Sequence, residues 1–191
     1  MNFLAHLFLA GDDPENIIGN FIADHVKGSA IDTYSQGIIK GIRFHRAVDE
    51  FTDNNDIVHE AVVRLRPAFK KYAGVVVDMY YDHFLANAWD DYSNEELIDF
   101  TRRMFEVIKS SHHLLPARSK YILPYMMADN WLLNYKYFEG LHRALSGISR
   151  RTKFESNLEN AVENLKGDYE YYKRSFNQFF PQLIEFSQIH K

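Results

Sequence analysis

The stretch DTYSQGIIKGIRFHRAVDEFTD, residues 32–53, decides the fold class of this chain. Ile42 follows Ile38 by four residues and Ile39 by three, the spacing that gathers side chains on one face of an α-helix. We therefore predict a helix over residues 32–48. The same spacing recurs through most of the chain and sustained strict alternation is scarce, so the sequence predicts an all-α protein.

Further helices are predicted on both sides of this one. Asp13 is expected to cap a helix that opens with Pro14, and Ser93 to cap another, with Glu96 completing a capping box. No repeat or linker divides the chain, so we expect residues 1–191 to form a single-domain helical bundle. The other predicted helices cover residues 2–9, 14–25, 57–72, 75–88, 94–110, 125–145 and 153–179.

Glycine and proline residues occur within or next to these predicted helices. Gly37 and Gly41 lie inside the helix predicted over residues 32–48, where each costs about 1 kcal/mol relative to Ala. Close packing against a neighbouring helix, or against substrate, would explain two glycines at this spacing. Pro124 and Pro181 are expected at the ends of later helices, because proline disrupts a helix interior.

Composition excludes several classes of protein. The chain has 191 residues, 46% of them hydrophobic, which suits one sizeable core. It has no Cys, so any metal must be bound by His and carboxylates. The net charge of −4 argues against non-specific nucleic-acid binding. No apolar run is long enough to span a membrane, and the N-terminal MNFLAHLFLAG lacks the basic start of a signal peptide, so we expect a cytoplasmic protein.

His45 and Asp49 are the first candidates for chemistry. They are four residues apart and project from one face of the helix, and Asp53 extends their line if the helix continues. Imidazole and carboxylate groups on adjacent turns are a ligand pair for a divalent metal. The alternative is a helix-capping Asp beside a surface His.

Two other segments place ionisable groups in apolar surroundings. Asp78 and Asp82 share a helical face with His83 beside them, and Asp24 lies in a second apolar stretch. Such groups are costly to bury unless they are paired or bound to metal. His6 stands alone on an apolar helix, where a satisfied core histidine is the alternative to a ligand.

Helices of a bundle can bring such groups together at one cleft. A thiol-free site of this kind suits Mn²⁺, with Mg²⁺ or Fe²⁺ as alternatives, and these ions activate water and neutralise phosphoryl groups. Phosphoester hydrolysis is therefore the expected reaction class. The expected metal ligands are His6, Asp24, His45, Asp49, Asp78, Asp82 and His83, and the strongest catalytic candidates among them are Asp24, His45, Asp49 and Asp82.

Basic residues supply candidate substrate contacts. The stretch from Arg143 to Lys153 contains no acidic residue and is either a solvated turn or a surface for phosphate or an acidic protein. Arg43 and Arg46 flank His45 closely enough to meet a phosphate held at the metal. The expected substrate-binding residues are Lys27, Arg43, Arg46, Arg150 and Arg151.

The segment DNWLLNY, residues 129–135, combines aromatic and polar groups at helical spacing. We expect it to pack in the core, and the alternative is that Trp131 or Tyr135 borders a ligand cleft. A serine hydrolase and a phosphate-binding glycine loop are excluded, because the chain contains neither a Gly-x-Ser-x-Gly segment nor a Gly-rich strand-to-helix turn.

Ordered motifs along the chain resemble the acyl carrier protein phosphodiesterase family. The resemblance implies a Mn²⁺-dependent enzyme that removes 4′-phosphopantetheine from holo acyl carrier protein, with a helical fold distantly related to the His-Asp metal phosphohydrolases. The chain departs from a His-Asp order, since Asp precedes His at residues 24–25 and 82–83, so ligand assignments do not transfer literally. The motifs are MNFLAHLFLA (1–10), GNFIADHVKG (19–28), HRAVDEFTD (45–53), YDHFLANAW (81–89), DNWLLNY (129–135) and SRR (149–151).

The mechanism implied by this resemblance begins with a metal that lowers the pKa of water, so that hydroxide attacks phosphorus and the carrier's serine oxygen leaves. Arg46 or Lys27 would stabilise the phosphoryl oxygens, and a spare Asp or His would protonate the leaving oxygen. Because such carriers are acidic, the basic stretch is a candidate docking surface. Two alternatives are a related hydrolase of nucleotides or other small phosphodiesters, and a non-catalytic module that binds an acidic protein; the oligomeric state stays open.

Overall fold

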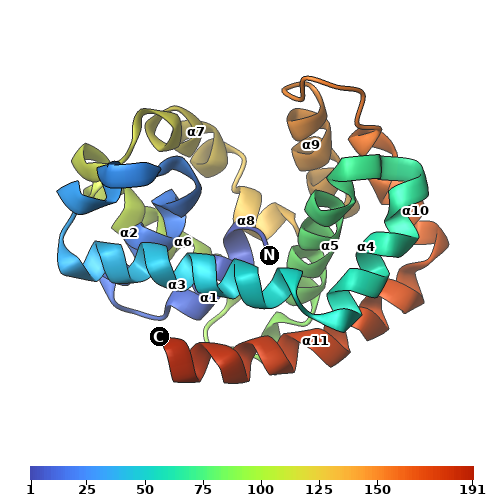
Figure 1. Ribbon diagram of the computed structural model, residues 1–191, viewed down its shortest axis with the longest axis horizontal. Coiled ribbons are helices and arrows are strands. Elements are labelled where there is room, and N and C mark those ends of the chain that lie inside the picture. Colours follow the sequence, from blue (N-terminus) through green and yellow to red (C-terminus); the bar gives the residue numbers. More distant parts are fainter.

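The computed structural model describes residues 1–191 and confirms the all-α prediction, with no β-strand (Figure 1). Short 3-10 turns join the helices, among them η1 (Ala23–His25) and η2 (Gly28–Thr33). The α-helices are α1 (Phe3–Ala10), α2 (Pro14–Ile22), α3 (Gln36–Asp53), α4 (Asp56–Phe69), α5 (Ala73–Asn87), α6 (Leu97–Ser110), α7 (Ala117–Ala128), α8 (Trp131–Asn134), α9 (Phe138–Ser149), α10 (Ala161–Gly167) and α11 (Tyr169–His190).

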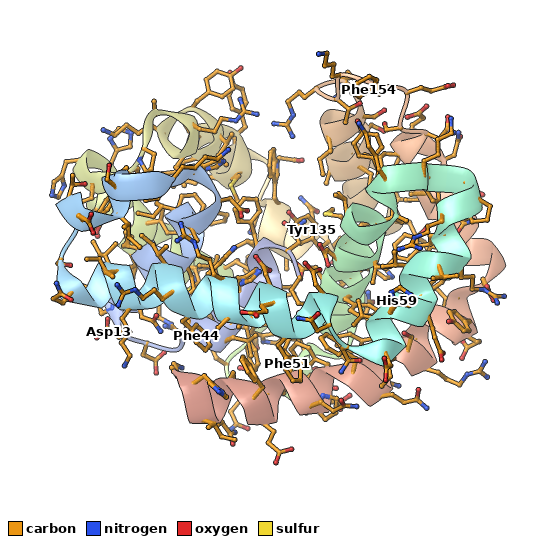
Figure 2. All side chains as sticks on the ribbon, viewed as in Figure 1. Asp13, Phe44, Phe51, His59, Tyr135 and Phe154 are labelled. Atoms are coloured by element: carbon orange, nitrogen blue, oxygen red, sulfur yellow. The ribbon has the colours of Figure 1, made fainter.

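The helices pack around one hydrophobic cluster of 52 buried residues. In Figure 1, α11 runs along the base of the molecule, α7 and α9 stand apart at the top, and α8 lies between them. Aromatic side chains join α3 to α11. Phe51, which Figure 2 labels between these two helices, stacks its ring on that of Phe186, with centroids 4.4 Å apart. None of the helices has both the length and the apolar character needed to cross a membrane.

Capping residues explain where α2 and α3 begin. The Asp13 carboxylate accepts a hydrogen bond from the Asn16 amide at 2.9 Å, and Pro14 opens α2, as the sequence predicts. The helix α3 begins at Gln36 rather than at residue 32, because η2 precedes it and Ser35 caps it. It continues to residue 53, which keeps His45 and Asp49 on one rigid helix.

The predicted capping box at Ser93 is wrong. The Ser93 hydroxyl accepts a hydrogen bond from the nearby Glu95 amide at 3.1 Å, so Ser93 shapes the loop before α6. Glu96 stands at the N-cap position itself and α6 begins at Leu97. Local side chain–backbone bonding of this kind is the usual competitor of a helix cap.

The single helix predicted over residues 125–145 is also wrong. Asn130 adopts a left-handed conformation, with φ of 34°, which ends α7, and its side chain caps α8 by accepting from the Leu133 amide. Pro124 and Pro181 lie inside α7 and α11 instead of ending helices. Tertiary packing therefore outweighs the helix-breaking tendency of both prolines.

A glycine contact fixes the crossing of α2 and α3. A Cβ atom added to Gly41 would lie 2.6 Å from the carbonyl oxygen of Asn16, and one added to Gly19 would lie 2.7 Å from the Cα atom of Gly41. Gly37 has the same role against the side chain of Glu15. Close helix packing, the first explanation offered for these glycines, is therefore confirmed, and it holds η1, which follows α2, against α3.

Candidate metal centre

His6, His45 and Asp49 form a compact cluster of possible ligands. Their candidate donor atoms all lie within 4.8 Å of one another. The two carboxylate oxygens of Asp49 lie 3.0 Å from Nε2 of His6 and 3.1 Å from Nε2 of His45. The imidazole rings stack with centroids 3.8 Å apart. This geometry brings together a predicted ligand from α1 and the predicted pair from α3.

Asp24 completes the cluster on its open side. Its carboxylate oxygen lies 3.4 Å from Nε2 of His45, and its side chain is 71% exposed. The position depends on the α2–α3 crossing, since Asp24 lies in η1 directly after α2. Arg46 strengthens the same junction by donating a hydrogen bond from Nη2 to the Val26 carbonyl at 2.8 Å. The cluster is thus buried on one side and reaches solvent through Asp24.

Several buried nitrogens of the cluster lack well-formed hydrogen bonds. Nδ1 of His6 and both ring nitrogens of His45 are in this position, although Nε2 of His45 lies within ion-pair distance of Asp24 and Asp49. Buried polar atoms are normally paired, because an unpaired one loses its hydration without compensation. Two imidazoles and two carboxylates are a donor set that suits Mn²⁺ or Fe²⁺. The residues present therefore fit a divalent cation.

Electrostatics give the cluster one site for a positive charge. Burial lowers the pKa of His6 to about 4, so this ring is neutral. Burial also opposes protonation of His45, but Asp24 and Asp49 outweigh it and raise the pKa to about 9. The imidazole of His45, 3.4 Å away, in turn lowers the pKa of Asp24. Without an ion, a proton on His45 supplies the positive charge that the two carboxylates require.

Asp82 makes its contacts outside this cluster. Its buried carboxylate accepts hydrogen bonds from the backbone amides of Leu4 at 2.8 Å and Ala5 at 3.2 Å, with Asn2 at 3.4 Å. These amides belong to the first turn of α1 and have no partner within the helix. Burial raises the pKa of Asp82 to about 7 against the opposing effect of the amides. Asp82 therefore holds the helix that carries His6.

His83 and Asp78 are also placed apart from the donor atoms. His83 donates from Nδ1 to the Tyr135 carbonyl at 2.8 Å and stacks on Phe138, with centroids 5.1 Å apart. Burial lowers the pKa of His83, so the ring is a neutral core group. Asp78 accepts from the amine of Met1 at 3.0 Å. The structure brings neither residue among the clustered ligand atoms.

The predicted substrate-binding cations divide into two groups. Lys27 and Arg46 are exposed and flank η1 beside Asp24. Arg43 lies on another surface of α3, in a hollow that it shares with His190 of α11. Arg150 and Arg151 lie at the end of α9, away from this helix. Only the first pair adjoins the cluster directly.

Comparison with known proteins identifies the family of this chain. The family model for acyl carrier protein phosphodiesterase matches residues 1–183. The chain belongs to this family. Its relatives include proteins named acyl carrier protein phosphodiesterase from Enterobacter sp. (strain 638), 32% identical, with 96% of each chain covered, and from Klebsiella pneumoniae (strain 342), 33% identical, with 98% of each covered.

Family membership confirms the resemblance seen in the sequence, and the family bears the name of an enzyme. The match covers both the cluster on α1, η1 and α3 and the segments that lie beyond it, as far as α11. The chain matches no solved structure. The expected likeness to the fold of the His-Asp metal phosphohydrolases therefore stays a prediction.

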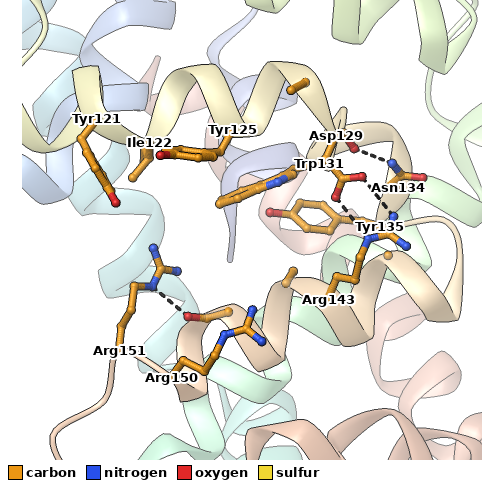
Figure 3. Close-up of a pocket in the computed structure, with 14 residues that line it drawn as sticks. Tyr121, Ile122, Tyr125, Asp129, Trp131, Asn134, Tyr135, Arg143, Arg150 and Arg151 are labelled. Atoms are coloured by element: carbon orange, nitrogen blue, oxygen red, sulfur yellow. Dashed lines mark hydrogen bonds and ion pairs between the residues drawn. The ribbon is translucent and has the colours of Figure 1, made fainter.

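A cavity of about 570 Å³ lies between α7, α8 and α9 (Figure 3). Trp131 and Tyr135 line it, which favours the cleft alternative over a purely internal role for this segment. Sequence reasoning missed Tyr121 and Tyr125, which line it from α7. The sequence does mark this wall of the cavity, because residues 107–128 contain no acidic residue and could have been predicted to form part of a basic surface.

Proposed function

We propose that this chain is a metal-dependent phosphodiester hydrolase that removes 4′-phosphopantetheine from holo acyl carrier protein and leaves the apo form. The family and the names of its relatives support the carrier protein as substrate. The observation that carries the hydrolytic chemistry is the compact cluster of His6, His45 and Asp49, in which buried ring nitrogens lack well-formed hydrogen bonds.

The cation of this site is Mn²⁺ in our proposal, with Mg²⁺ or Fe²⁺ as alternatives. His6, His45 and Asp49 would hold it, and Asp24 would complete the set from the solvent side. When bound, such an ion lowers the pKa of water and neutralises charge on phosphoryl oxygens. Asp82 contributes by fixing α1, and through it the position of His6.

The protein's own groups account for orientation and proton transfer. Asp24 is the most exposed acidic group of the cluster and can accept a proton from the attacking water. A bond forms between the water oxygen and phosphorus while the bond from phosphorus to the serine oxygen breaks, and the serine oxygen takes up a proton. Lys27 and Arg46 stand beside Asp24, where they can bind phosphoryl oxygens.

A direct test incubates the purified protein and Mn²⁺ with holo acyl carrier protein and weighs the carrier by mass spectrometry. We expect the mass of 4′-phosphopantetheine to be lost from the carrier and to appear as the free product. Asp24→Asn should abolish the loss, whereas the exposed His59→Ala on α4 should leave it unchanged. Loss of phosphopantetheine without added metal, after chelation, would refute the metal requirement.

Arg150 and Arg151 are proposed to meet the acidic surface of the carrier. Both are exposed, and neither forms an ion pair with a carboxylate. Replacing both with Glu should raise KM for the carrier protein about tenfold or more, since opposed charges then become like charges. Turnover of bis(4-nitrophenyl) phosphate, which has no protein part, should change much less. Equal kinetics on the carrier would remove these residues from the docking surface.

A further inference from the structure

The cavity between α7 and α9 has the size and lining of a small-molecule site. Its volume of about 570 Å³ lies within the usual range for ligand pockets. Trp131 and Tyr135 form its inner wall, and Tyr125 faces them from α7 (Figure 3). The hydroxyl of Tyr135 points into the cavity although its ring is buried. Aromatic faces and phenolic groups together suit a flexible ligand with apolar and amide parts.

Positive charge collects at the mouth of this cavity, although the whole chain is negative. The two walls come from residues 107–128 and from the end of α9, and residues 140–154 contain no acidic residue either. Arg151 donates to the Gly147 carbonyl at 2.8 Å but meets no carboxylate. Burial and the nearby charges of Arg118 and Arg150 lower its pKa. Cations held together without counter-charges favour an anionic ligand.

Arg143 is the exception among these cations, because it is paired with a carboxylate, and this limits where an anion can bind. Arg143 forms an ion pair with Asp129, with Nε 3.2 Å from a carboxylate oxygen. Its charge is therefore already balanced at one end of the cavity (Figure 3). The unbalanced cations lie at the opposite end, around Arg151. An anionic group should sit at that end, and the uncharged part of the same ligand should extend inward.

A chain of contacts links the charged mouth to the cluster of His6, His45, Asp49 and Asp24. His25 follows Asp24 in η1, and its Nδ1 lies 2.7 Å from the hydroxyl of Ser119 in the first turn of α7. Arg118 precedes Ser119 and is close enough to lower the pKa of both His25 and Arg151, as a secondary effect after burial. The start of α7 thus connects the exposed side of the cluster to the cavity mouth.

A second connection lies at the inner wall. His83 is hydrogen-bonded to the Tyr135 carbonyl, and the neighbouring Asp82 binds the first turn of α1. The charge of Asp82 contributes to raising the pKa of Tyr135, after burial. The cavity wall and the helix that carries His6 are therefore held by adjacent residues of α5.

We propose that this cavity binds the pantetheine chain of the substrate, with the phosphate at the mouth beside Asp24 and the carrier protein outside. The proposal rests on the proposed function, which supplies the substrate. Pantetheine carries two methyl groups on one carbon, a hydroxyl and two amides along a flexible chain that ends in a thiol. The methyl groups can pack on Trp131, and the amides can meet the hydroxyls of Tyr125 and Tyr135. Recognition of the chain makes the enzyme selective for a modified serine over other phosphodiesters.

Binding can be measured without any turnover. The chain has two tryptophans, of which Trp131 lines the cavity and Trp89 is buried in the core against Phe100. Protein labelled with 5-fluorotryptophan should give two ¹⁹F resonances, and D-pantetheine should shift only that of Trp131. Inorganic phosphate alone should shift it much less. No shift up to millimolar D-pantetheine, or an equal shift of both resonances, would overturn the proposal.

Gly147 allows the cavity to be filled without disturbing the fold. It lines the cavity from α9, and a Cβ atom added there meets nothing within 4 Å. Gly147→Leu should raise KM for holo acyl carrier protein about tenfold, equivalent to about 1.4 kcal/mol, and abolish the pantetheine-induced shift. The affinity for Mn²⁺, which depends on the separate cluster of His6, His45 and Asp49, is the control for an intact fold. Gly167→Leu, at an exposed glycine with equally open surroundings, is the matched control.

The results separate the two proposals. If D-pantetheine shifts Trp131 and Gly147→Leu prevents the shift, the cavity site stands even if the carrier is not cleaved, and only the proposed reaction fails. If the carrier is cleaved but Gly147→Leu leaves both KM and the shift unchanged, the cavity site fails. A Gly147→Leu variant that does not fold leaves the decision to the wild-type titration with D-pantetheine.

Discussion

Asp24-His25 and Asp82-His83 are the same dipeptide in two regions of the chain, and the structure uses them differently. Asp24 is 71% exposed beside an imidazole, whereas Asp82 is fully buried and holds backbone amides. His25 contacts the hydroxyl of Ser119, and His83 packs in an aromatic core. A dipeptide thus indicates ionisable groups, but the partners on neighbouring elements decide whether they serve chemistry or stability.

The difference follows from where helix ends fall. The first amides of α1 have no partners within their helix, and α5 passes close enough for Asp82 to supply one. At η1, the nearest groups to Asp24 are His45 and solvent, so its oxygens stay available. The same carboxylate group stabilises a helix in one region and stays exposed beside an imidazole in the other.

Removing a ligand from the cluster should give the largest effect. His45→Ala leaves Asp24 and Asp49 as opposed carboxylates with no cation-holding imidazole between them, so activity on holo acyl carrier protein should fall about 100-fold or more. The measurement is kcat/KM with saturating Mn²⁺, alongside circular dichroism to verify folding. Near-wild-type activity in a folded His45→Ala protein would place the chemistry elsewhere.

Removing the helix cap should act on stability instead. Asp82→Ala leaves the amides of Leu4 and Ala5 buried without an acceptor, so the free energy of unfolding should fall by roughly 2–3 kcal/mol. Urea denaturation of the metal-free protein measures this directly. Asp24→Ala is the matched control and should change stability far less. Equal destabilisation by both substitutions would erase the distinction between the two regions.

Protons should compete with metal at the cluster. His45 has a pKa of about 9 in the metal-free protein and must lose its proton to bind an ion, so binding at pH 7 should release about one proton. Apparent affinity should then fall about tenfold per pH unit below pH 9. His6, with a pKa of about 4, adds no proton between pH 5 and 9.

Calorimetry of Mn²⁺ binding at pH 7, in two buffers with different ionisation enthalpies, counts the released protons. Asp24→Asn removes one of the carboxylates that raise the pKa of His45, so it should reduce that number. Binding whose heat is independent of the buffer would show that His45 is already unprotonated, contrary to its two carboxylate contacts.

The smallest effect is expected at His83. His83→Phe keeps the stacking with Phe138 but leaves the Tyr135 carbonyl without its donor, which costs about 1 kcal/mol of stability. Metal affinity and pH dependence should match those of the wild type. A loss of metal affinity as large as that of His45→Ala would instead show that His83 binds the metal.

The sequence was sufficient for the fold class and for the centre of the site. Helical spacing predicted α3, and with it the common face of His45 and Asp49. The placement of Asp82 could not be predicted, because its partners are backbone amides of α1 that spacing alone does not reveal. The cavity depends on the left-handed Asn130, which separates α7 from α8 where periodicity suggests one continuous helix.

The contact between Gly19 and Gly41 makes one part of the site more rigid than another. Two backbones that touch directly leave no side chain to rearrange, so the crossing of α2 and α3 has little compliance. Asp24 lies on a short turn after that crossing and is open to water, so in the proposed metal centre it would be the one ligand free to adjust. Such a centre would accept ions of slightly different radius without moving the helices.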